Sequence, residues 1–109
     1  MSRAKGNLAE AKALQHLVQN GFEIVDQNVY SRFGEIDIIA KKNGVLHFIE
    51  VKSSLDYESA IYNITSKKLQ RVIKTAQVYL KKNGIASEYV FDAVIVTPHQ
   101  IEIVENLTM

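Results

Sequence analysis

The sequence of 109 residues predicts a mixed α/β fold, a five-stranded sheet flanked by helices, with its elements in the order α-β-β-β-α-β-β. Two observations predict this class. Apolar residues recur at helical spacing in two segments, and five short segments rich in Val, Ile and Phe separate and follow them. The hydrophobic fraction of 47% suits one core, and no linker or repeat divides the chain. We therefore expect a single domain over residues 1–109.

The first expected element is a helix from Ala4 to Asn20, which ends at Gly21, a residue suited to the left-handed turn that closes a helix. Its predicted buried face consists of Ala11, Leu14, Leu17 and Val18. The next two segments, Phe22–Val25 and Asn28–Tyr30, predict a short, interrupted strand.

Two strands, Phe33–Lys41 and Val45–Ser53, are predicted to form a hairpin around Asn43-Gly44. Asn and Gly both tolerate the positive φ angles of a type I′ turn, so this pair is a strong hairpin signal. Residues 55–64 show no regular pattern.

A second helix is predicted from Thr65 or Ser66 to Gly84. Its apolar stripe consists of Leu69, Val72, Ile73, Ala76, Tyr79 and Leu80. The chain then forms two more strands. Tyr89–Thr97 is nearly all apolar, as expected of a strand covered on both faces, and Gln100–Glu105 is shorter and more polar.

The predicted hairpin brings acidic side chains together. A two-residue turn at Asn43-Gly44 places Asp37 directly opposite Glu50, and Glu35 opposite Lys52. Residues two apart share a face, so all four side chains project from one side of the sheet. Opposed carboxylates repel each other, and a divalent cation such as Mg²⁺ or Mn²⁺ would relieve the repulsion. The alternative is a solvated polar face with an ordinary cross-strand ion pair.

Glu10 is a further acidic candidate, because it falls on the apolar arc of the first helix, where a lone buried charge is costly. If this helix packs over the hairpin, Glu10 joins the acidic site. The alternative is that Glu10 reaches water near the helix start, where a carboxylate favours the helix dipole.

Basic residues line one flank of the second helix at spacings of three and four, and another precedes the hairpin. These candidate phosphate contacts are Lys67, Lys68, Arg71, Lys74 and Arg32. A lysine-rich flank is also typical of a solvated helix face. In the irregular segment, Tyr57 and Tyr62 either stack on nucleic-acid bases or pack against the core.

Two polar residues fall within apolar strands. Asp92 is expected to serve as a structural hydrogen-bonding partner, and His47 is expected on the hairpin face away from Asp37. The three histidines share no spacing typical of a metal site.

The segments Gly34–Ala40, Gly-Glu-Ile-Asp-Ile-Ile-Ala, and Phe48–Lys52, Phe-Ile-Glu-Val-Lys, resemble the split Asp…Glu-x-Lys signature of the restriction-endonuclease-like superfamily. More narrowly, the whole chain resembles the YraN family of small uncharacterised bacterial proteins. The shared blocks also include Ala-Glu-Ala in the first helix, Lys-Lys-Leu at the start of the second helix, and a Phe-Asp strand.

The resemblance implies a restriction-endonuclease-like sheet and a nuclease site. Asp37 and Glu50 would be metal ligands, and the Val51 carbonyl would complete the ligand shell. Lys52 would orient or activate the attacking water, and Glu10 would act as an auxiliary acid. The chain departs from the family pattern at Tyr30 and Ser54, where relatives usually carry arginines that would contact phosphate.

The expected function is therefore metal-dependent hydrolysis of phosphodiester bonds, in DNA more than RNA, during repair, recombination or processing. One alternative is a nucleic-acid-binding module of the same fold with little catalytic activity, acting through a partner. Another is action on a different phosphoester. The small size is compatible with a homodimer or a larger protein partner.

Composition adds expectations about location. The chain has no cysteine, its N-terminus lacks the apolar core of a secretory signal, and no apolar run is long enough to span a membrane. We expect a cytoplasmic protein without membrane attachment. The net charge of +1 is too small to indicate nucleic-acid binding by itself.

Overall fold

The computed structural model describes the backbone of residues 2–107 and the side chains of residues 8–107. Its elements are α1 (Ser2–Gln19), β1 (Glu23–Ser31), β2 (Gly34–Lys42), β3 (Val45–Ser53), α2 (Tyr57–Tyr62), α3 (Ser66–Lys82), β4 (Glu88–Val96) and β5 (Ile101–Val104). The five strands form one mixed sheet in the order β1-β2-β3-β4-β5. Only the β3–β4 pair is parallel, because α2 and α3 carry the chain across the sheet between these strands. The predicted fold class is confirmed.

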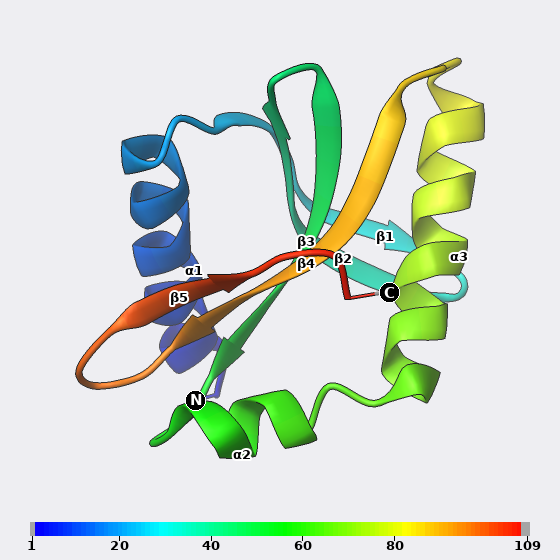
Figure 1. Ribbon diagram of the computed structural model, residues 1–109. Helices are drawn as coiled ribbons and strands as arrows, with labels where there is room; N and C mark the ends of the chain where they lie inside the picture. Colours follow the sequence, from blue (N-terminus) through cyan, green and yellow to red (C-terminus); the bar gives the residue numbers. More distant parts are fainter. Residues whose placement is uncertain (1, 108–109) are drawn as a thin grey trace.

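Helices cover the sheet on both sides (Figure 1). On one face, Ala9, Ala13 and Leu17 of α1 pack against buried aliphatic side chains of β2, β3 and β4. On the other face, Val72 and Ala76 of α3 pack in a cluster that includes the fully buried Phe48. The predicted apolar stripe of this helix is confirmed. A smaller cluster places α2 on β4.

The buried face of α1 differs from the predicted one. Ala11 and Val18 are exposed, so their assignment to the core is wrong, whereas Leu17 is buried and Leu14 partly buried. The buried row is Ala9, Ala13 and Leu17, spaced by four residues. Small alanines let the helix backbone approach the sheet closely, so the contact depends on two residues that carry little hydrophobic signal.

The tip of the β2–β3 hairpin has the predicted register. Asn43 and Gly44 have φ angles of 53° and 79°, as a type I′ turn requires. Lys42 pairs with Val45, and the ladder continues in step to Ile38 and Ile49. The predicted interrupted strand is one continuous strand, β1, with a register shift between Ile24 and Asp26.

The segment without a sequence pattern contains a short helix, so the element order is α-β-β-β-α-α-β-β. Asp56 caps α2, because its side chain accepts a hydrogen bond of 2.8 Å from the Ser59 N–H. Ala60 is buried, and Tyr57 and Ile61 pack beside it against the sheet. A helix of six residues is too short to show a clear periodicity, which explains why the sequence pattern missed it.

Within the described residues, none of the helices is both long and apolar enough to cross a membrane.

Candidate functional site

The candidate site lies where β2 and β3 separate. Their ladder ends at Ile38 and Ile49, one step before the predicted Asp37–Glu50 pair. Beyond this point, Asp37 Oδ2 accepts a hydrogen bond of 2.8 Å from the backbone N–H of Val51. A side-chain carboxylate thus replaces a strand carbonyl as the partner of β3. Asp37 and Glu50 remain neighbours, but they are not a regular ladder pair.

A local distortion opens the two strands. Asn28 has a φ of 51°, and the β1–β2 ladder passes Asn28 and Asp37 without pairing them. Ile36 and Ile39 pack in the same cluster, although strict alternation would place residues three apart on opposite faces. The regular alternation of faces along β2 is therefore interrupted around Asp37.

The interruption also changes the predicted neighbour of Glu35. Glu35 pairs with Tyr30 of β1, and the β2–β3 ladder does not reach Lys52. The predicted Glu35–Lys52 cross-strand pair is therefore wrong. The prediction assumed a regular pleat along the whole hairpin, and the pleat is regular only on the turn side of Asp37.

Asp37 is a partly buried carboxyl surrounded by other acids. Its pKa is raised from 3.8 to about 7, first by burial, then by the neighbouring Glu50, and to a smaller extent by Glu35 and Glu10. The hydrogen bond from Val51 opposes this rise only in part. The influence of Glu10 means that α1 brings this side chain into the electrostatic neighbourhood of Asp37, as one of the two interpretations of Glu10 expects.

Glu50 has acidic and basic neighbours together. Burial raises its pKa and Glu35 adds to the rise, whereas Lys52 and Lys68 lower it. Glu50, Lys52 and Lys68 line one narrow pocket between the sheet and α3. The structure thus brings together Asp37, Glu50, Lys52 and Lys68, with Glu10 more remote.

The acidic pair suits a hard divalent cation, because Asp37 and Glu50 offer carboxylate oxygens and repel each other without a cation between them. Among the described side chains, residues 8–107, no three His, Cys, Asp or Glu residues are grouped closely enough to hold a metal ion. A cation would therefore need further oxygen ligands from the backbone or water. The Val51 carbonyl stays a predicted ligand.

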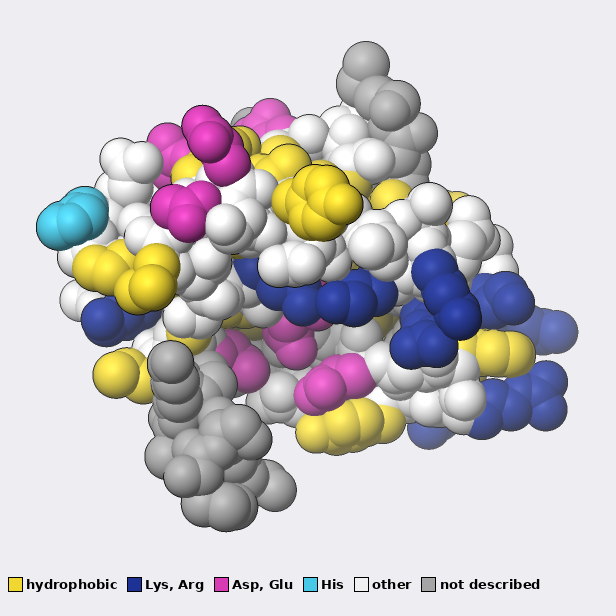
Figure 2. All heavy atoms as spheres, turned by 90° about the horizontal axis from the view of Figure 1, so that it is seen from below, with side chains coloured by type: hydrophobic (Ala, Val, Ile, Leu, Met, Phe, Trp, Pro, Cys, Tyr) yellow, Lys and Arg dark blue, Asp and Glu magenta, His cyan; other side chains and the backbone are white. Residues whose placement is uncertain are grey.

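Three of the other predicted basic residues, Arg32, Arg71 and Lys74, lie around the turn between β1 and β2. The Arg32 guanidinium carbon lies 4.9 Å from the centre of the Phe33 ring, and Lys74 Nζ lies 5.5 Å from it. Arg71 lies over Gly34, where an added Cβ would come within 3.2 Å of the Arg71 Cβ. Lys67 is exposed in the first turn of α3. Figure 2 shows basic side chains in a band with acidic side chains directly beside it.

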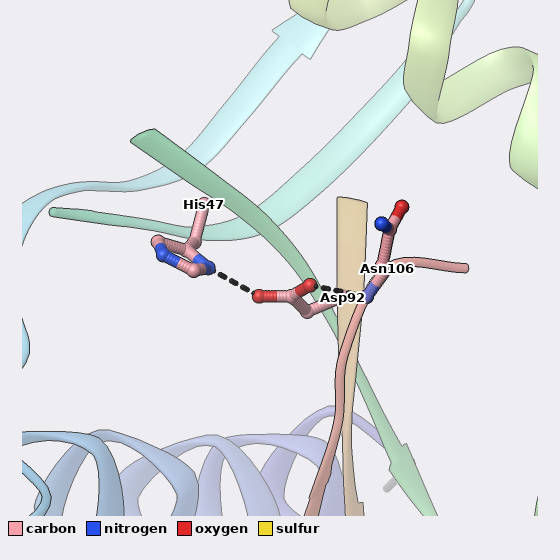
Figure 3. Close-up of polar contacts among 3 residues, drawn as sticks. All are labelled: His47, Asp92 and Asn106. Carbon is pink, nitrogen blue, oxygen red and sulfur yellow. Dashed lines mark hydrogen bonds and ion pairs between the residues drawn. The ribbon is translucent and has the colours of Figure 1, made fainter. Parts of the chain in front are cut away.

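A second buried aspartate has a different environment (Figure 3). Asp92 Oδ2 lies 2.5 Å from Nδ1 of His47, and Asp92 Oδ1 accepts a hydrogen bond of 2.8 Å from the backbone N–H of Asn106. The prediction that Asp92 is a structural hydrogen-bonding partner is confirmed. Its partner His47 was missed, because it lies 45 positions away on the parallel neighbour β3.

These features define a class of protein: a small mixed α/β fold with an acidic pair and adjacent lysines where two strands diverge. Residues 9–96 match the uncharacterised protein family UPF0102, and the chain belongs to this family.

Three similar proteins match this chain over their whole length. The UPF0102 protein of Sulfurimonas denitrificans is 61% identical over 109 residues, and that of Wolinella succinogenes is 51% identical over 109 residues. The UPF0102 protein of Aliarcobacter butzleri is 49% identical over 110 residues. Each similarity covers 100% of both chains.

Proposed function

We propose that this protein is a metal-dependent nuclease that hydrolyses phosphodiester bonds in DNA. One observation carries the proposal: two partly buried carboxylates, Asp37 and Glu50, lie together with Lys52 beside them. A stable fold gains nothing from burying Asp37 beside Glu50, because both the burial and the neighbouring carboxylate raise the pKa of Asp37. The arrangement is expected where a cation and a phosphate are to be bound.

Asp37 and Glu50 would hold Mg²⁺ or Mn²⁺, with the Val51 carbonyl as a further ligand. When bound, the cation supplies Lewis acidity toward the phosphate and lowers the pKa of a bound water. The hydrogen bond from the Val51 N–H fixes the Asp37 carboxylate before any ligand arrives. Fixed ligands reduce the reorganisation that binding would require.

Lys52 lies two residues after Glu50 on the same strand, and its ammonium group can orient the attacking water or stabilise charge on the phosphate. Lys68 approaches Glu50 from α3 and offers a second cation at the same pocket. Glu10 influences Asp37 least among the neighbouring acids, so we assign it an auxiliary role.

The substrate is proposed to be a nucleic acid because basic side chains extend beyond the acidic pair. Arg32, Arg71 and Lys74 gather at one turn, and Lys67 lies in the first turn of α3. A chain of phosphates can contact several of these cations at once, whereas a small phosphoester cannot. DNA rather than RNA, and a role in repair, recombination or processing, follow from the family resemblance alone.

Cleavage of single-stranded, duplex and branched DNA in Mg²⁺ or Mn²⁺ tests the proposal. We expect product only in the presence of the metal, none with a chelator, and a loss of at least about 100-fold in rate for Asp37→Asn and Lys52→Met. Glu23→Gln is the matched control, because it removes an exposed acid on β1 and should retain activity.

Binding of Mn²⁺ separates the metal site from the chemistry. Titration calorimetry should detect binding to the unmodified chain and much weaker binding to Asp37→Asn. Metal and DNA binding without cleavage of any substrate would contradict the nuclease proposal and favour a binding module that acts through a partner.

A further inference from the structure

The segment between β3 and α3 exposes two large apolar side chains. Leu55 and Tyr62 are each 85% exposed, more than any other large hydrophobic residue among the described side chains. Leu55 precedes α2 and follows Lys52 by three residues, and Tyr62 is the last residue of α2. A single exposed apolar residue needs no explanation, but two in the segment that joins Lys52 to Ile64, both of which line the pocket of Glu50, do.

The exposure of Tyr62 is built into the fold. Ala60, Ile61 and Tyr57 pack α2 against β4, and Asp56 caps the start of the helix. The sequence is compatible with two alternatives for Tyr57 and Tyr62, contact with nucleic-acid bases or packing against the core. Tyr57 belongs to the core, whereas Tyr62, the last residue of α2, faces solvent. The packed side of α2 therefore positions the backbone of Tyr62, and the ring extends into solvent.

The charges next to this segment favour a polyanion. Lys67 and Lys68 lie in the first turn of α3, directly after the connection from α2, and this turn contains no acidic residue. Cations are unfavourable at the start of a helix unless they meet negative charge. Glu50 supplies such a charge to Lys68, whereas Lys67 is exposed and can meet the negative charge of a ligand. Exposed rings and aliphatic groups beside lysines are typical of surfaces that bind single strands of nucleic acid.

We propose that Leu55 and Tyr62 contact unpaired bases of the DNA strand that enters the Asp37–Glu50 site. Tyr62 stacks on one base, Leu55 contacts its neighbour, and Lys67 binds the adjoining phosphate. In an intact duplex the base faces are already stacked, so the proposal assigns the site a single strand or the unpaired part of a branched molecule. This proposal rests on the proposed function, which places a DNA strand at the Asp37–Glu50 site. Base contact itself does not require cleavage.

Fluorescence anisotropy with labelled oligothymidylate and a matched duplex tests the proposal. The full chain carries Asp37→Asn throughout, so that cleavage does not interfere. We expect Tyr62→Ala to weaken single-strand binding roughly tenfold and Leu55→Ala several-fold, with duplex affinity changed less than about twofold. Tyr62→Phe retains the ring and should bind as the parent does. Val18→Ala controls for the loss of an exposed aliphatic side chain on α1.

Several results would overturn the proposal. One is unchanged single-strand affinity in Tyr62→Ala, and another is an equal loss for single strand and duplex. A third is that Tyr62→Ala or Leu55→Ala changes the oligomeric state measured by gel filtration, which would identify the surface as a protein interface. If the parent binds no nucleic acid, this proposal and the nuclease proposal both fail. If Tyr62→Ala weakens single-strand binding but the unmodified chain never cleaves DNA, base contact stands and the nuclease proposal fails.

Discussion

The two partly or fully buried aspartates of the sheet differ in how their charge is compensated. Both oxygens of Asp92 have a partner, His47 on one side and the Asn106 N–H on the other. Asp37 receives one backbone hydrogen bond, and its other neighbours include three glutamates. The first environment stabilises the fold, whereas the second costs stability unless a cation binds. The comparison suggests that Asp92 is structural and Asp37 functional.

The largest expected effect on stability is at Asp92, whose charge is compensated. Asp92→Ala removes the contact with His47 and the hydrogen bond from the Asn106 N–H, so we expect a loss of about 3 kcal/mol in the free energy of unfolding, measured with urea. Glu105 is an exposed acid next to Asn106, and Glu105→Ala should change the free energy of unfolding by less than about 0.5 kcal/mol. Equal effects of the two substitutions would contradict the structural role of Asp92.

A substitution at Asp37, whose charge is not compensated, is expected to stabilise the fold. Asp37→Asn removes a charge that burial and neighbouring acids disfavour, and the amide oxygen can still accept the hydrogen bond from Val51. We expect the metal-free variant to be more stable than the unmodified chain by about 2 kcal/mol at pH 8, in the same urea experiment. A destabilised Asp37→Asn would remove the contrast between the two aspartates.

The pH dependence sharpens the same contrast. The folded pKa of Asp37, about 7, lies above the value of 3.8 expected in the unfolded chain. The folded state therefore binds the proton more tightly, and this contribution to stability is complete below about pH 4 and lost as the pH rises to 7.

Unfolding at a series of pH values checks this sign. The stability difference between Asp37→Asn and the unmodified chain should be small at pH 4 and largest near pH 8. Millimolar Mg²⁺ at pH 8 should raise the unfolding midpoint of the unmodified chain and leave Asp37→Asn unchanged. A Mg²⁺ effect of equal size in both would place the cation elsewhere.

The smallest effect is expected at Glu10, whose influence on Asp37 is the weakest of the three glutamates. Glu10→Gln should lower Mn²⁺ affinity by no more than about fivefold, equivalent to about 1 kcal/mol, when titration calorimetry compares it with the unmodified chain. A loss as large as that of Asp37→Asn would make Glu10 a direct ligand.

The hairpin illustrates what the sequence predicts and where it fails. Asn43-Gly44 determines the turn, and the register follows correctly as far as Ile38 and Ile49. The strands diverge at Asp37, opposite Asn28 of β1, which has a positive φ and is skipped by the β1–β2 ladder, and the hairpin sequence alone does not indicate this irregularity. Asp37 and Glu50 were therefore correctly predicted as neighbours, but the prediction of a directly opposed ladder pair was wrong.

Nonlocal contacts account for the other differences. Ala9 and Ala13 form the buried row of α1 because the sheet accepts a close helix, which alanine spacing alone does not indicate. The partner of Asp92 depends on the parallel β3–β4 pairing, and sequence periodicity gives no register for strands joined through two helices. The helix α2 was not predicted because six residues are too few to show a helical periodicity.

The spacing of contacts along the chain also has a consequence for the order of folding. The Asp37–Val51 hydrogen bond joins residues 14 positions apart, whereas the His47–Asp92 contact spans 45 positions. Closing the longer loop costs about 1 kcal/mol more in chain entropy. We therefore expect the hairpin that carries Asp37, Glu50 and Lys52 to form early, and β4 to join it late. The contact between His47 and Asp92 would then mark completion of the sheet, after the acidic pair has already been brought together.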